Sequence, residues 1–120
     1  MSIVDRLMED ARLLRLLLPP SAVNGSAEIY VITFADDSGR FYLGQHRLPP
    51  GADADPDYLG SGTELKNLPE ERRCKLQLLR LKGSWADLIE ELLVRKYREL
   101  YGERCLNRPV SAVNYFKQLR

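Results

Sequence analysis

The chain has 120 residues, of which 18 are Lys or Arg and 17 are Asp or Glu, so its formal net charge is +1. Hydrophobic residues make up 44% of the chain, which excludes an intrinsically disordered protein and, at this length, predicts one globular domain. A net charge this small gives no overall attraction to nucleic acid or to a membrane surface, so an anionic partner requires a local basic patch.

Residues 2–18 are predicted to form a helix that ends at Pro19-Pro20, because proline cannot continue a helix. Apolar side chains recur at helical spacing on one side of this helix, at Ile3, Leu7, Ala11, Leu14 and Leu18. Three further leucines, Leu13, Leu16 and Leu17, widen the apolar face. Two uses of this helix stay open: packing on a sheet, or forming a homodimer. Its apolar run is too short for a membrane span, and no membrane partner is expected.

An antiparallel hairpin is predicted after a turn at residues 24–26. Residues 28–34 and 40–44 are rich in strand-forming residues, and the turn signal at 36–39 joins them. Residues 48–57 contain three prolines, one glycine and three aspartates. They are predicted to form a mobile acidic loop, long enough to be functional.

The second half of the chain is predicted to contain a short helix at residues 63–68, a third strand at 75–81 and a long helix at 84–101. Ser84 and Asp87 resemble a capping box at the start of the long helix, and Gly102 is a plausible stop. A C-terminal tail, residues 109–120, is predicted to carry a short strand near residues 112–116.

Glu90 lies at the edge of the apolar stripe of the long helix. The stripe consists of Trp85, Leu88, Ile89, Leu92 and Leu93. A carboxylate at such a boundary is poorly solvated unless a cation or a divalent metal pairs with it. Asn107, beyond the helix, is expected to bond local backbone. The single His46 and two separated cysteines argue against a zinc site.

Several short motifs occur in an order that resembles the GIY-YIG nuclease domain. They are Glu28-Ile29-Tyr30, Tyr42-Leu43-Gly44 with His46 beyond it, Tyr58-Leu59-Gly60-Ser61-Gly62, Glu90 and Asn107. The Tyr42 and Tyr58 motifs together look like the phage-type branch. The resemblance covers residues 27–108, and residues 1–20 form an N-terminal helical extension to it. It implies an α/β fold with a small three-stranded antiparallel sheet flanked by helices.

The resemblance also implies a metal-dependent DNA endonuclease that hydrolyses phosphodiester bonds. Glu90 would hold Mg²⁺ or Mn²⁺, and Tyr30 would position or deprotonate the attacking water. Tyr42 would orient water or phosphate, and His46 is an alternative base. Arg47 and Lys66 would grip phosphate. Further nucleic-acid contacts are expected from Arg95, Arg98 and Asn107.

Two departures from the family pattern leave a second function open. Glu28 replaces the first glycine, which is a minor change because only the tyrosine is chemically needed. The family's usual arginine is absent at Gly51-Ala52-Asp53. The alternative is a catalytically inactive protein of the same fold that binds a partner as an inhibitor or adaptor. For the nuclease, the expected partner is double-stranded DNA, and the expected location is the cytoplasm of a bacterium or phage-infected host.

Overall fold

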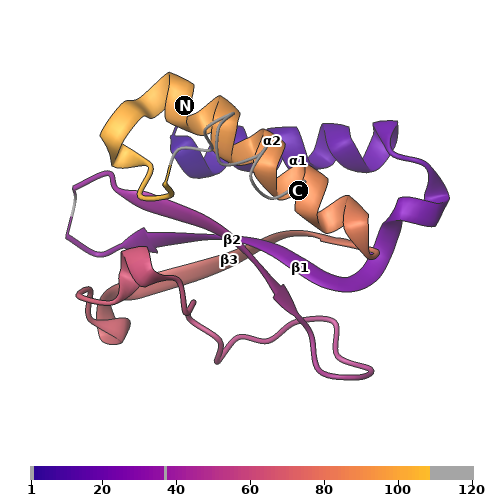
Figure 1. Ribbon diagram of the computed structural model, residues 1–120, viewed down its shortest axis with the longest axis horizontal. Coiled ribbons are helices and arrows are strands. Elements are labelled where there is room, and N and C mark those ends of the chain that lie inside the picture. The colour runs from indigo at the N-terminus through magenta and orange to yellow at the C-terminus, as the bar shows by residue number, and fades with distance from the viewer. Residues whose placement is uncertain (1, 37, 109–120) are drawn as a thin grey trace, which may run out of the picture.

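The computed structural model describes residues 2–36 and 38–108 as a three-stranded antiparallel sheet with two helices on one face (Figure 1). The elements are α1 (Ile3–Leu17), β1 (Val23–Phe34), β2 (Phe41–Arg47), β3 (Arg73–Leu81) and α2 (Ser84–Tyr101). The central strand is β1, because the strand order is β2-β1-β3. This arrangement confirms the predicted fold class. The predicted tail, 109–120, and its strand at 112–116 lie outside the described residues.

The N-terminal helix α1 begins at a capping box, in which Ser2 and Asp5 each accept a bond from the other's backbone N–H. Leu7 and Ala11 are buried, and the other apolar residues of the predicted face pack against the same core. Of the two uses that the sequence left open for this helix, the structure shows packing on the sheet. Within the described residues, no helix is both long and apolar enough to cross a membrane.

The predicted turn at residues 24–26 is wrong, because β1 already begins at Val23. Asn24 has φ 58°, and the β1–β3 register shifts between Val23 and Ala27, so the turn signal produces an irregularity inside a strand. A side chain at Gly25 would collide with the backbone of Leu81. The glycine is needed for close strand approach, not for a chain reversal.

The second strand, β2, continues to Arg47, beyond the predicted end at residue 44. His46 and Arg47 therefore belong to the strand, and Glu28 lies opposite His46 in the register. The short helix predicted at 63–68 is a single 3₁₀ turn, η2 (Thr63–Leu65), and a second one, η3 (Glu70–Arg72), leads into β3.

The helix α2 differs from its prediction at the start and along its buried face. Its N-cap is Gly83, and Ser84 is its first residue, so the predicted capping box is wrong. Asp87 instead accepts a 2.6 Å hydrogen bond from the Gln45 side chain. Gly102 caps the other end as predicted, with φ 60°.

The buried face of α2 is rotated away from the predicted stripe. It consists of Ala86, Ile89, Leu93, Val94 and Tyr97, whereas Leu88 and Leu92 are about half exposed. The apolar arc of this helix is wider than the sheet can cover, so packing selects one part of it. The selected part borders Glu90, which is partly buried as predicted.

Candidate functional site

The sheet face opposite the helices carries most of the predicted catalytic residues. Residues at alternate positions of a strand point to the same face. In the register of β1 and β2, Ile32 is paired with Tyr42, Tyr30 with Gly44, and Glu28 with His46. Tyr30 and Ile32 pack with Tyr42, Tyr58 and Leu65, in a cluster separate from the core beneath the helices. Tyr30, Tyr42 and His46 therefore share one face, and His46 does so because β2 continues beyond its predicted end.

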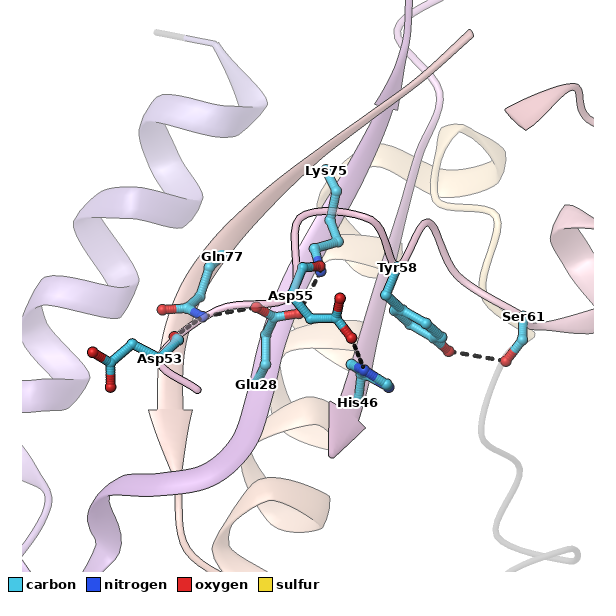
Figure 2. Close-up of polar contacts among 8 residues, drawn as sticks. All are labelled: Glu28, His46, Asp53, Asp55, Tyr58, Ser61, Lys75 and Gln77. Atoms are coloured by element: carbon cyan, nitrogen blue, oxygen red, sulfur yellow. Dashed lines mark hydrogen bonds and ion pairs between the residues drawn. The ribbon is translucent and has the colours of Figure 1, made fainter. Parts of the chain in front are cut away.

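Residues 53–62, which we call the strap, run across this face and are bonded to β2 and β3 (Figure 2). The carboxylate of Asp55 lies 2.8 Å from Nε2 of His46 on β2. The backbone carbonyl of Asp55 accepts a hydrogen bond from Lys75 on β3. The carbonyl of Asp53 accepts a 2.9 Å bond from Gln77, and the Asp53 carboxylate pairs with Arg80. The predicted acidic loop is thus anchored at its C-terminal half.

Beneath the strap lies a buried ion pair between β1 and β3. Nζ of Lys75 is 2.6 Å from one carboxylate oxygen of Glu28, and the Gln77 amide donates to the other at 2.7 Å. Glu28 is fully buried. Removing two charges from water is expensive, and only such complete hydrogen bonding makes it tolerable. Glu28 is therefore a centre of this face and not a minor replacement of a family glycine.

Tyr58 on the strap links the polar network to the tyrosines. Its ring stacks on His46, with centroids 3.6 Å apart, and it meets the Tyr30 ring edge-on at 5.9 Å. Its hydroxyl lies 2.9 Å from Oγ of Ser61. The ammonium of Lys75 is 5.5 Å from the centroids of both tyrosine rings. Sequence reasoning gave Tyr58 no role, although it quoted the motif that contains it.

Two glycines of the same motif allow the strap to approach the sheet closely. A side chain at Gly62 would collide with the hydroxyl of Tyr42. At Gly60, which has φ +89°, it would collide with Ile32 and Leu65. The two glycines of the Gly-Ser-Gly sequence are therefore explained by close packing against the cluster that contains Tyr42, Ile32 and Leu65.

Glu90 on α2 acts electrostatically on two residues of the tyrosine cluster. Burial raises the pKa of Tyr30 well above its ordinary range, and Glu90 is one of several nearby groups that add to the rise. Burial, with the charges of Glu64 and Glu90, raises the pKa of Tyr42 to about 12. Glu90 therefore lies close enough to act electrostatically on both phenols. The Tyr30 hydroxyl lies against Gly44 on the edge strand β2, and a side chain at Gly44 would collide with it.

The pKa of Glu90 is itself raised, mainly by burial, and the neighbouring Asp87 adds to the rise while the Gln45 side chain opposes it. The phenols and the carboxyl are thus all held in an environment that disfavours their charged forms. Deprotonation of water by a Tyr30 phenolate gains no support here, since that tyrosine stays protonated at neutral pH.

The predicted phosphate-binding residues are spread over different parts of the surface. Arg47 and Lys66 are exposed at the end of β2 and after η2, respectively. Arg95 is paired with Glu91 at 2.9 Å on the exposed side of α2. The cation that the structure places against Tyr30 is Lys75, which carried no site assignment in the sequence.

Arg98 and Asn107 have structural contacts that account for them. Oδ1 of Asn107 accepts a 2.9 Å bond from the Leu43 amide, and its Nδ2 donates to the Leu43 carbonyl at 2.6 Å. Arg98 donates to the carbonyls of Cys105 and Asn107. Asn107, which is buried, anchors the C-terminal segment to β2, and Arg98 anchors it to α2. The expected bond to local backbone is wrong, because the side chain of Asn107 bonds the backbone of Leu43 on β2, which is distant in the sequence.

No group of three or more His, Cys, Asp or Glu side chains suited to a metal ion occurs within residues 2–36 and 38–108. Comparison with known proteins gives no match: no protein-family model, no curated protein and no solved structure is similar to this chain. The interpretation of the site therefore depends on its own residues.

Proposed function

We propose that the protein is a metal-dependent DNA endonuclease of phage or mobile-element type, which hydrolyses phosphodiester bonds. One observation carries the proposal: the phenols of Tyr30 and Tyr42, from two strands, pack in one cluster, and Glu90, from a helix, is among the groups that raise their pKa values. These residues are far apart in the sequence. Tyr30 and Tyr42 share one face of the sheet, and Glu90 comes from the helix layer. Their order in the chain resembles that of the GIY-YIG domain, which supports a shared chemical role.

The donor set at Glu90 fits Mg²⁺ or Mn²⁺. Asp87 precedes Glu90 by one helical turn and is close enough to raise its pKa. Hard divalent ions are commonly bound through one or two carboxylates, with water at the remaining positions. A cation held by these side chains would offset the desolvation of Glu90. When bound, it would supply charge stabilisation at the phosphate and the leaving oxygen.

The tyrosines act in this proposal as hydrogen-bond donors. Because their pKa values are raised, both phenols keep their protons at neutral pH. They orient the attacking water or a phosphate oxygen. His46 takes the proton, since imidazole is the usual general base and Asp55 holds its ring through Nε2. Lys75 supplies positive charge beside the Tyr30 ring.

Substrate reaches the cluster only after the strap moves. Tyr30 is 2% exposed, and the Tyr58 ring packs against it. Segments that cover a site until substrate binds are common in enzymes. The proposal therefore includes displacement of Tyr58 when DNA binds.

Plasmid nicking with Mg²⁺ or Mn²⁺ tests the proposal. Wild-type protein is compared with Glu90→Gln, which keeps the shape of the side chain, and with Glu91→Gln, a neighbouring control on the same helix. We expect Glu90→Gln to lose cleavage while Glu91→Gln retains it. Equal cleavage by both variants, or a folded wild type that cuts no DNA, would overturn the proposal.

The second candidate is a non-catalytic protein of the same fold that acts as an inhibitor or adaptor. It is favoured because two cations on the strap face already pair with carboxylates of the same chain. Lys75 pairs with Glu28, and Arg80 pairs with Asp53. The acidic strap would also repel a phosphate backbone. Intact folding without cleavage of any nucleic acid is the outcome this candidate predicts.

For the nuclease we propose double-stranded DNA as the partner and the bacterial or phage-infected cytoplasm as the location. A homodimer through the N-terminal helix is a separate proposal, because α1 lies on the other face of the sheet and does not contribute to this cluster.

A further inference from the structure

The layer formed by α1 and α2 exposes a group of leucines that the chain itself does not cover. Leu16 and Leu17 near the end of α1 are 73% and 79% exposed. Leu13 on the same helix, and Leu88 and Leu92 on α2, are about half exposed. We call these five residues the leucine patch. Scattered apolar residues are normal on a surface, but a contiguous apolar patch with a polar rim marks an interaction site.

A groove of about 220 Å³ runs through this patch between the two helices. Leu13 and Leu17 line one side of it, and Ile89 and Leu92 line the other. Asp10 and Lys96 form a 2.7 Å ion pair at the groove, where the first half of α1 lies beside the second half of α2 (Figure 1). The groove is therefore apolar along its walls and has a neutral pair of charges within it.

The last cation of α1 does not interrupt the patch. Arg15 turns toward the sheet and donates a 2.9 Å hydrogen bond to the carbonyl of Leu78. Pro19 and Pro20 then stop the helix immediately beyond Leu18. The end of α1 is thus left apolar in the direction away from the sheet.

Three ion pairs involve charged residues that lie next to the patch, either in the sequence or in the groove. Glu9 pairs with Arg12 at 2.6 Å, Asp10 with Lys96 at 2.7 Å, and Glu91 with Arg95 at 2.9 Å. A nucleic acid or an anionic membrane surface would require an excess of basic residues here. A strongly charged protein partner would likewise require an excess of the opposite sign.

A second copy of the same chain requires neither excess. In a two-fold symmetric dimer, one patch faces itself, so a net charge on it would repel its own copy. An apolar centre with charges already neutralised in pairs satisfies this condition. We propose that the leucine patch is the interface of a homodimer, in which the α1–α2 layer of one protomer packs against that of its partner. This proposal does not depend on the nuclease function.

Sedimentation velocity over a wide concentration range, with light scattering as a second measure of mass, tests this interface. We expect wild-type protein to have the mass of a dimer at high concentration and to dissociate on dilution. Leu17→Glu and Leu92→Glu should each be monomeric, and their circular dichroism should match that of the wild type. Leu76→Glu is the matched control, because Leu76 is an exposed leucine on β3, and this variant should stay dimeric.

The salt dependence gives an independent check. Because the interface is apolar and its charges are paired within each protomer, the dimer dissociation constant should change little between low and moderate salt. A wild type that is monomeric at every concentration overturns the proposal. So does a dimer that survives both Leu17→Glu and Leu92→Glu, since its interface would then lie elsewhere.

Discussion

The two faces of the sheet are stabilised by different kinds of interaction. On the helix face, Ile29, Val31 and Phe41 pack with apolar residues of both helices. On the strap face, a buried ion pair, Glu28 with Lys75, lies beside a cluster of tyrosines. Apolar burial is non-directional and tolerates many partners, whereas a buried charge requires particular ones. The helix face therefore supports the fold broadly, and the strap face depends on a few specific contacts.

The largest expected effect comes from emptying the helix face. Phe41 is fully buried and meets the rings of Tyr97 and Tyr101 edge-on at 6.2 and 5.7 Å. Phe41→Ala should lower the free energy of unfolding by about 4–5 kcal/mol, because it removes the side chain and leaves a cavity. Urea denaturation measures this loss. Leu76→Ala, at a partly exposed site, should cost much less, and equal losses would contradict the assignment of the core.

A loss of about 3 kcal/mol is expected from Glu28→Ala on the strap face, because Lys75 is then left as an uncompensated buried charge. The double variant Glu28→Met with Lys75→Met removes both charges and should recover most of this stability. The same denaturation experiment compares them. If the double variant were as unstable as the single one, shape rather than charge would govern this face, and the contrast between the faces would fail.

His46→Phe should loosen the strap at a cost of about 1 kcal/mol. The substitution keeps an aromatic ring to stack on Tyr58 but loses the contact with the Asp55 carboxylate. Amide hydrogen exchange in the strap should become faster, while exchange in α1 should not change. Arg47→Ala is the control at the next, exposed position. Unchanged strap exchange in His46→Phe would mean that other contacts hold the strap.

The smallest expected effect is the contribution of Glu90 to the pH dependence of the free energy of unfolding. Its pKa in the folded protein is raised above the ordinary value of 4.5, mainly by burial. The unfolded state then loses its proton first, so stability from this group is present at acidic pH and is lost as pH rises through the raised value. Glu90→Gln should remove this decline.

Urea denaturation across a pH series, without divalent ions, checks this prediction. At neutral pH the Glu90→Gln variant should be the more stable protein, and added Mg²⁺ should narrow the difference if it binds at Glu90. Asp87→Asn gives a comparison at the neighbouring carboxyl, because removing that charge should lower the pKa of Glu90. An identical pH profile for wild type and Glu90→Gln would show that Glu90 is better solvated than the structure indicates.

Much of the fold follows from local patterns in the sequence. The helical repeat of Leu7 and Ala11 predicted the buried face of α1, and strand-forming residues predicted all three strands. The errors occurred where a local signal had more than one solution. Asn24-Gly25 reads as a turn but forms an irregularity within β1, and the wide apolar arc of α2 left its buried side undetermined.

The candidate site was predicted in part. The sequence predicted that Tyr30 and Tyr42 lie on adjacent strands and that Glu90 lies at the edge of an apolar stripe. It ended the second strand before His46, so the shared face of Tyr30, Tyr42 and His46 came from the structure. Tyr58 was present in a quoted motif without a role. Lys75 had no distinguishing signal at all, because a lysine at the start of a predicted strand is usually exposed.

The sequence by itself determined the elements, their order and the faces on which alternating residues lie, because periodicity is a property of neighbouring residues. Only the tertiary structure decided that Glu28 meets Lys75, that Asp55 meets His46, and that Glu90 acts electrostatically on two tyrosines. These partners are distant in the chain. Their contacts depend on how the strands, the helix and the strap pack together. A local sequence pattern carries no information about contacts between residues so far apart in the chain.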